Sequence, residues 1–287
     1  MQEARVGIIG GSGLYELEGM THVTHIRVNT PFGDTSDPIT LGEIKGVRAA
    51  FLPRHGHGHV LMPSELPYKA NIYALKSLGV EYIIAISAVG SLKEKIKPTD
   101  IVIPDQIIDR TFLRSDTFFG NGVVAHVAFA DPYCPVLSDV LYEAVQKTGC
   151  RVHDGGTAIV MEGPQFSTRA ESELYRSWGA DVIFMTGIPE AKLAREAEIC
   201  YATMAVVTDY DCWNEVSETV STEMVVENFH KTINTAKKAL QHAIVNLPPK
   251  RDCVCGHALE NAIITSPEKI PDKLKKDLSL IIGKYIQ

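Results

Sequence analysis

Short runs of apolar residues, many of them β-branched, recur along this chain and are separated by polar or glycine-containing segments. Such runs are typical of strands that are buried in a sheet. The opening run, Val6 to Ile9, is followed at once by a glycine-rich loop. The predicted strands are 6–9, 47–54, 82–90, 100–109, 157–164, 181–186 and 201–209.

Five longer segments between or after these runs have helical periodicity. In the last of them Val225, Phe229, Ile233 and Leu240 recur at helical spacing. Alternating strands and helices predict one α/β domain over 1–287, with a central mixed β-sheet flanked by helices and with 248–287 as a C-terminal tail and helix packed on it. The predicted helices are 64–79, 136–149, 167–179, 189–199 and 221–247.

Composition and charge argue against a nucleic-acid-binding protein and against a membrane protein. The chain has 287 residues, is 45% hydrophobic, and carries a formal net charge of −7, whereas a nucleic-acid-binding protein usually presents a basic face. Neither a secretory signal nor a membrane-spanning apolar segment is evident in the sequence. We therefore expect a cytoplasmic protein that binds neither nucleic acid nor membrane.

The glycine-rich loop, GGSG from Gly10 to Gly13, predicts an anion site at the end of the first strand. A dinucleotide fingerprint would need glycine at position 16, where this chain has glutamate, and no lysine of a triphosphate-binding loop follows. Ser12 supplies a hydroxyl beside the backbone amides. The loop therefore suits one small anion, although a simple turn is the alternative.

A second group of polar residues, PRHGHGH, follows the strand that ends at Arg54. Arginine can hold phosphate through two parallel hydrogen bonds. In an extended segment His55, His57 and His59 would share one face and resemble a metal triad, but the intervening glycines indicate an irregular loop instead.

Three further strand ends carry polar residues. They are SAVGSL (Ser87 to Leu92), the Met185–Thr186 pair, and TDYDCW, in which Asp209 and Asp211 are two apart and are expected to face the same way. Binding sites of α/β proteins gather at the carboxyl ends of the strands. We therefore expect these segments to meet in one site.

The six cysteines pose a separate question. Cys253 and Cys255 form a CVCGH motif with His257, but a zinc site needs four ligands and the sequence shows no second cysteine pair. Cys134 and Cys200 stand alone in the sequence and are typical of small buried hydrophobes. Reduced thiols are favoured over a disulfide or a metal site.

Taken in order, these motifs resemble the trimeric purine nucleoside phosphorylases, and among them the members that cleave 5′-methylthioadenosine. The resemblance runs over nearly the whole chain, through GGSGLY, PRHGHGH, SAVGSL, MEGPQFSTRAES, MTGIPEA and TDYDCW. It implies a nucleoside phosphorylase fold with a partly barrel-like sheet, a homotrimer or dimer of trimers, and active sites near subunit interfaces. It also implies no metal and no cofactor, with inorganic phosphate as co-substrate.

The resemblance assigns roles to individual residues. Phe166 would stack on the purine, and Met185 would lie beneath the ribose. Asp209, assisted by Asp211, would protonate the leaving adenine at N7. The residues that would surround phosphate are Ser12, Arg54, His55, Ser87, Thr186 and, through its backbone, Ala88.

Specificity is implied at both ends of the substrate. Relatives that cleave guanosine and inosine have glutamate in place of Ser167 and asparagine in place of Asp209, so this chain is expected to prefer a 6-aminopurine. At the 5′ end, Thr222, Val225 and a neighbouring subunit's His126 would line the pocket. Thr222 stands where valine is more usual in the family, and this replacement would admit adenosine as well. Phe184 stands where the family usually has asparagine.

The implied reaction is phosphorolysis of 5′-methylthioadenosine to adenine and 5-methylthioribose 1-phosphate in purine and methionine salvage. Four alternatives stay open. They are a broader purine nucleoside or methylthioinosine phosphorylase, a hydrolytic nucleosidase, a non-catalytic adenine-nucleoside binding protein, and a zinc hydrolase that uses His55, His57 and His59.

Overall fold

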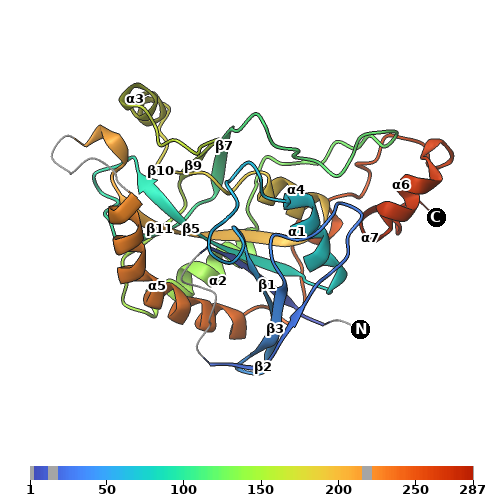
Figure 1. Cartoon of the computed structure of the whole chain (residues 1–287), viewed down its shortest axis with the longest axis horizontal. Helices are drawn as coiled ribbons and strands as arrows, with labels where there is room; N and C mark the ends of the chain where they lie inside the picture. The colour runs from blue at the N-terminus through green and yellow to red at the C-terminus, as the bar shows by residue number, and fades with distance from the viewer. Residues whose placement is uncertain (1–2, 12–18, 215–221, 287) are drawn as a thin grey trace.

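A mixed sheet of eleven strands forms the centre of the structure, a computed structural model that describes residues 3–11, 19–214 and 222–286 (Figure 1). Eight strands follow the order β2-β3-β4-β1-β5-β10-β9-β7, and β11, β6 and β8 branch from β5. The strands are β1 (Val6–Gly10), β2 (Met20–Ile26), β3 (Ile39–Ile44), β4 (Val47–Pro53), β5 (Tyr82–Ser91), β6 (Ile101–Ile103), β7 (Gln106–Arg110), β8 (Val152–Asp154), β9 (Thr157–Met161), β10 (Val182–Phe184) and β11 (Cys200–Asp209).

Strand β5 is the branch point of the sheet. Its first residues, 82–85, lie between β1 and β11, parallel to both. Pairing with β11 continues to residue 90, and the last two residues pair with β10 in the antiparallel sense. Strand β4 runs parallel to β1 on the far side. The carboxyl ends of β4, β1, β5 and β11 therefore meet at one edge, where polar residues that follow each strand can converge.

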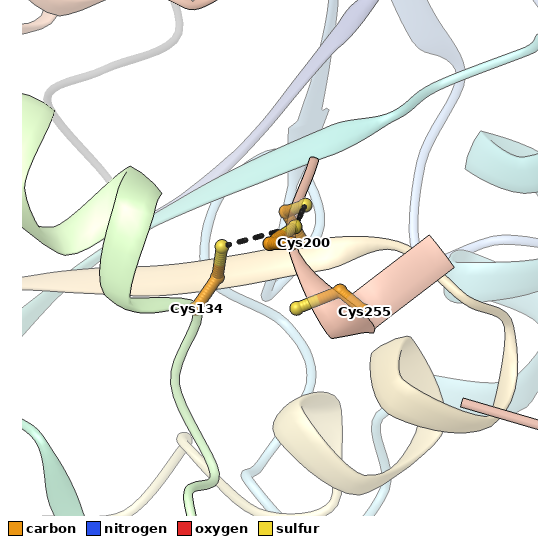
Figure 2. A group of neighbouring side chains, drawn as sticks. Cys134, Cys200 and Cys255 are labelled. Atoms are coloured by element: carbon orange, nitrogen blue, oxygen red, sulfur yellow. Dashed lines mark hydrogen bonds between the residues drawn. The ribbon is translucent and has the colours of Figure 1, made fainter. Parts of the chain in front are cut away.

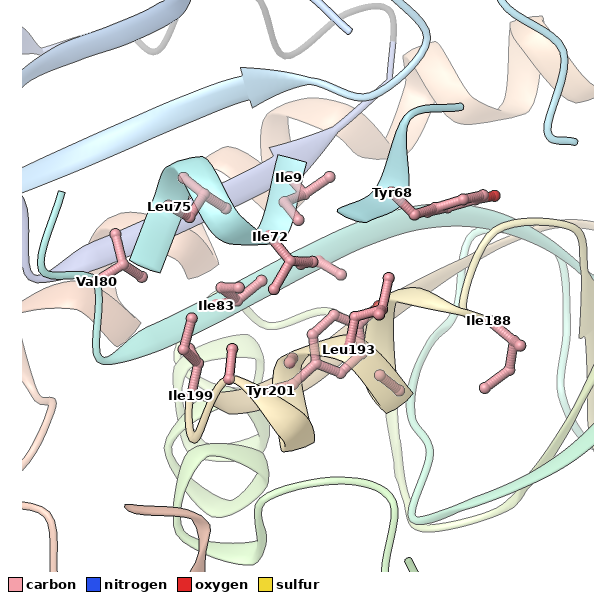
Figure 3. Close-up of a cluster of buried hydrophobic side chains, with 14 of the residues drawn as sticks. Ile9, Tyr68, Ile72, Leu75, Val80, Ile83, Ile188, Leu193, Ile199 and Tyr201 are labelled. Carbon is pink, nitrogen blue, oxygen red and sulfur yellow. The ribbon is translucent and has the colours of Figure 1, made fainter. Parts of the chain in front are cut away.

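The helices cover both faces of the sheet. Along β5 the side chains alternate, so that Ile83 joins a hydrophobic cluster on one face and Ile84 a cluster on the other. Figure 3 shows the first cluster, between the sheet and helices α1 and α4. Helices α2 and α5 pack on the second face. The helices are α1 (Tyr68–Ser77), α2 (Pro135–Gln146), α3 (Arg169–Ser177), α4 (Glu190–Glu196), α5 (Thr222–Val245), α6 (Asp272–Asp277) and α7 (Ser279–Ile282).

The predicted fold class, an α/β domain with a mixed central sheet flanked by helices, is confirmed, and so are the five predicted helices in position. The apolar run 100–109 was expected to be one strand and is two, β6 and β7, because Pro104 and Asp105 interrupt the ladder. Strands β2, β3 and β8 were not predicted. Strand β2 is mostly exposed and mixes threonine and histidine with apolar residues, so it lacks a buried-strand signal.

The segment after α5 packs back on the domain. It contains two short helices, α6 and α7, rather than the single helix expected, together with two 3₁₀ turns, η2 (Val254–His257) and η3 (Pro267–Lys269). Leu278, Ile281 and Ile282 are buried in the first cluster, whereas Cys255 belongs to the second. Among the helices that the structure describes, none is both long enough and apolar enough to cross a membrane.

Candidate active site

A cavity of about 450 Å³ lies where the carboxyl ends of β4, β5 and β11 meet the β10–α4 turn and the start of α5. Every predicted site residue lines it except two: Ser12 lies outside the described residues, and His126 is elsewhere on the surface. In particular, Arg54 and Asp209 share this one cavity. The predicted residues that line it are Arg54, His55, Ser87, Ala88, Phe166, Ser167, Met185, Thr186, Asp209, Asp211, Thr222 and Val225.

Arg54 follows β4 and is held in a buried ion pair with Glu190 at the start of α4. Its Nε lies 2.5 Å from Glu190 Oε1 and its Nη2 lies 3.1 Å from Oε2, while Nη1 donates to the carbonyl of Ile86. Burial alone would lower the pKa of Arg54, but the attraction of Glu190 outweighs it, so the pKa is raised. The Nε–H group and one Nη2–H group of Arg54 therefore bind Glu190 and are not available to phosphate. A guanidinium has five N–H donors, so two remain for an anion.

The tautomer of His55 follows from its hydrogen bond to a carbonyl oxygen. Its Nδ1 lies 2.9 Å from the carbonyl oxygen of Leu61, so this nitrogen carries the proton and donates it. Burial and the nearby Arg54 lower the pKa of His55 to about 4. The second ring nitrogen, Nε2, is therefore an acceptor at neutral pH.

The three histidines of PRHGHGH do not form a metal triad. Gly56 and Gly58 have φ values of +70° and +80°, which turn the backbone so that the strand-like alternation is lost. The His55 ring stacks on His59 with centroids 4.2 Å apart, whereas His57 is exposed. The expectation of an irregular loop is confirmed.

Two hydroxyls that line the same cavity as Arg54 lie close together. Ser87 Oγ on β5 is 3.2 Å from Thr186 Oγ1, which follows β10, and both residues are buried. Hydroxyls can donate to an anion after small rotations about χ1. This pair and Arg54 line the same cavity.

Asp209 and Asp211 also line the cavity. They were expected to face the same way through strand alternation, but a different local geometry brings them together. Strand β11 ends at Asp209, and Asp211 begins a 3₁₀ turn with φ +52°, so strand alternation does not place them together. Instead, the Asp211 amide donates to Asp209 Oδ1 at 2.8 Å, and Thr208 Oγ1 donates to Asp209 Oδ2 at 2.7 Å. Burial raises the pKa of both carboxyls, and Asp209 adds to the effect on Asp211. Asp211 Oδ2 has no hydrogen-bond partner among the described residues.

Gly90 allows Asp209 to approach β5. A Cβ at position 90 would lie 2.9 Å from Asp209 Oδ1 and 3.2 Å from Ile183 Cγ2. We expect Gly90→Ala to displace the Asp209 carboxyl and lower kcat/KM by roughly tenfold to a hundredfold, because displacements of about 1 Å have costs of that order. The control is Gly256→Ala, whose added Cβ meets nothing closer than 3.6 Å. Equal kinetics for the two variants would show that this close approach is unimportant.

A second buried ion pair supports the cavity wall and was not predicted. Arg114 Nε lies 2.9 Å from Glu162 Oε1, and the arginine also donates to the carbonyl oxygens of Met185 and Ile188. Glu162 accepts further bonds from the amides of Phe112 and Leu113, and this set of hydrogen bonds lowers its pKa to about 2 despite burial. The turn that carries Met185 and Thr186 is thus fixed by charged groups. Glu162 lies in the MEGPQFSTRAES motif but was given no role from the sequence, and no quoted motif contains Arg114.

Apolar residues line much of the rest of the cavity, together with His59 and His230. Phe166 is 46% exposed at its rim, a position from which an aromatic face can stack on a flat ligand. Phe184 is buried instead, and its ring fills the space above Gly187, where a Cβ would lie 2.6 Å from Cζ. Phe184 therefore contributes an apolar side chain to the cavity wall, where the asparagine implied by the resemblance would contribute a polar one.

Comparison with known proteins identifies the family. A family model described as the phosphorylase superfamily matches residues 5–247. The chain belongs to this superfamily. It is 56% identical to an S-methyl-5′-thioadenosine phosphorylase of Geobacter sulfurreducens, over 99% of this chain and all of that protein, and 51% identical to one of Gloeobacter violaceus, over 99% of this chain and 96% of that protein.

Solved structures agree with this membership of the phosphorylase superfamily. A methylthioadenosine phosphorylase from an antarctic soil metagenomic library superposes with a TM-score of 0.94 at 48% identity, and covers 98% of this chain and 99% of that one. A methylthioadenosine phosphorylase from Schistosoma mansoni in complex with adenine has a TM-score of 0.83 at 33% identity, with 98% of each chain covered. The nucleoside phosphorylase fold inferred from the motifs is therefore confirmed.

Proposed function

We propose that this phosphorylase cleaves 5′-methylthioadenosine with inorganic phosphate to give adenine and 5-methylthioribose 1-phosphate. The C1′–N9 bond breaks, its electron pair stays with adenine, and a phosphate oxygen bonds to C1′. The relatives that align with 99% of this chain carry this activity in their names. The products enter purine and methionine salvage.

One observation carries the assignment of the site: Arg54 and Asp209 line the same cavity, so phosphate and purine can be held together. Arg54, the Ser87 and Thr186 hydroxyls and the Ala88 backbone would bind phosphate, with Ser12 completing the site. Because His55 Nε2 is an acceptor, we assign it to the P–OH group of HPO₄²⁻. The unprotonated phosphate oxygens then face the developing positive charge on the ribose.

At the purine end, Asp209 would donate a proton to N7 and so improve adenine as a leaving group. A carboxyl with a raised pKa is protonated more often than an ordinary aspartate, which suits this role. Asp211 would assist through its unpartnered oxygen. Ser167 offers no carboxylate to a 6-oxopurine, so adenine derivatives are preferred, with Phe166 stacking on the base.

The 5′ substituent would contact Thr222 and Val225 of α5, with Met185 beneath the ribose. His126 is exposed and lies outside the cavity of its own chain, as the proposed contribution to a neighbouring subunit requires. A homotrimer or dimer of trimers, a cytoplasmic location and the absence of a cofactor in catalysis belong to the same proposal.

A substrate panel tests this function. Methylthioadenosine, adenosine, inosine and methylthioinosine are incubated with the enzyme, with and without phosphate, and the free base and sugar phosphate are measured by chromatography. We expect methylthioadenosine to react fastest, adenosine more slowly, and neither to react without phosphate. Release of free methylthioribose without phosphate would instead indicate a hydrolase, and tight binding without turnover would indicate a binding protein.

A further inference from the structure

Four cysteines that are far apart in the sequence meet on the opposite side of the sheet from α1 and α4. Cys134 precedes α2, Cys200 begins β11, and Cys255 lies in η2 of the tail (Figure 2). Cys253 directly precedes η2. Their four Sγ atoms all lie within 4.8 Å of one another. The sequence argument against zinc depended on the lack of a second cysteine pair. That premise is wrong, because the fold supplies Cys134 and Cys200.

The separations suit one ion bound by four thiolates. A Zn–S bond of about 2.3 Å in a tetrahedron places the sulfurs about 3.8 Å apart. Cys134 Sγ lies 3.8 Å from Cys253 Sγ, and Cys200 Sγ lies 3.3 Å from Cys253 Sγ. All six cysteines are free, and disulfides would draw together only pairs of sulfurs, at about 2.05 Å, rather than all four around one point.

The surroundings also suit a thiolate cluster. Three of the four cysteines are buried, and the positive charge of Arg195 reaches Cys255, while Arg251 packs beside Gly256. Positive groups nearby reduce the cost of a site whose net charge would be −2.

Tyr82 offers a further donor near the cluster. It pairs with Cys200 in the register of β5 and β11. Its hydroxyl is buried and has no hydrogen-bond partner among the described residues. Metal-bound thiolates usually accept hydrogen bonds from surrounding groups, and this phenol could supply one after a small movement.

We propose that Cys134, Cys200, Cys253 and Cys255 bind a structural zinc ion that fastens the C-terminal tail to the sheet. Four protein ligands leave no open position, which is the property of a structural site rather than a catalytic one. The tail in turn pairs with the segment that holds His126: the His126 amide donates to Ala262, and the Ile264 amide to Val124. Loss of the ion is therefore expected to loosen both segments.

The first test is the metal content of the full-length protein, produced with zinc and kept under reductant. Mass spectrometry of the metal is expected to find about one zinc per chain, and cobalt substitution should give the visible bands of a tetrahedral thiolate site. The proposal would be overturned if the protein held no metal after reconstitution with zinc salt. It would also be overturned if, without reductant, the protein bound no zinc, formed two disulfides and left only two titratable thiols.

Variants locate the site. Cys253→Ser and Cys255→Ser are expected to lose zinc, melt at lower temperature and exchange amide hydrogens faster at 253–265 and 124–126. The matched control is Cys150→Ser, since Cys150 lies outside the cluster and bonds to the Thr99 carbonyl. Chelation of zinc from the unmodified protein should reproduce the loosening without any substitution. Full zinc content in both cluster variants would contradict this assignment.

Discussion

Asp209→Asn is expected to lower kcat for methylthioadenosine by about 10²- to 10⁴-fold, the range that positioned proton donors contribute. Asparagine keeps the shape of the side chain: its oxygen can still accept from the Asp211 amide, and its NH₂ group can donate to the Thr208 hydroxyl, which then acts as the acceptor. It cannot give up a proton to N7. The loss should therefore appear in kcat at saturating phosphate, with little change in the melting temperature.

The pH profile separates a proton donor from a merely structural aspartate. Burial raises the pKa of Asp209, so the protonated donor predominates below that pKa and is lost as the pH rises through it. We expect activity of the unmodified enzyme to fall on the alkaline side and the asparagine variant to lack that limb. Asp139→Asn, at an exposed position on α2, is the matched control. An unchanged kcat in Asp209→Asn would refute the proton-donor role.

The same variant tests the choice of base. The amide of asparagine can both donate and accept, which suits a 6-oxopurine better than a carboxyl does. The ratio of inosine to methylthioadenosine turnover is therefore expected to rise in Asp209→Asn. A fall of both activities by the same factor would assign base selectivity to Ser167 and its neighbours instead.

Much of the site could be predicted from the sequence because its residues follow recognisable strands. Arg54, Thr186 and Asp209 come directly after or at the ends of apolar runs, and parallel strands bring their carboxyl ends to one edge. That rule needs no knowledge of side-chain contacts. The resemblance to the phosphorylases then supplied roles that geometry alone leaves open.

The pairings between distant side chains could not be predicted. Arg54 and Glu190 are 136 residues apart, and Arg114 and Glu162 are 48 apart, yet each pair forms through burial in the finished fold. The cysteine cluster is hidden for the same reason. Likewise, Asp211 reaches the site through a positive-φ turn, which a rule based on strand alternation does not describe.

Glu190→Gln is expected to destabilise the protein by about 3–5 kcal/mol in phosphate-free buffer, since it leaves the buried Arg54 charge without its partner. Arg54 and Glu190 have side-chain exposures of only 2% and 3%. Phosphate binding beside Arg54 would restore negative charge. Added phosphate should therefore raise the melting temperature of this variant more than that of the unmodified enzyme, as measured by calorimetry.

The matched control is Glu81→Gln, which removes the partner of Arg5 in a pair that is one-quarter to one-third exposed. Solvent-exposed pairs contribute about 0–1 kcal/mol to stability. If Glu190→Gln and Glu81→Gln lowered the free energy of unfolding by similar amounts, burial would not set the Arg54 pair apart from the Arg5 pair. The double variant Arg54→Met with Glu190→Leu separates stability from function. Because two apolar side chains replace two buried charges, much of the stability should return, whereas the KM for phosphate should stay raised. Recovery of phosphate binding in that double variant would mean that Arg54 supports the fold and leaves the anion to Ser87 and Thr186.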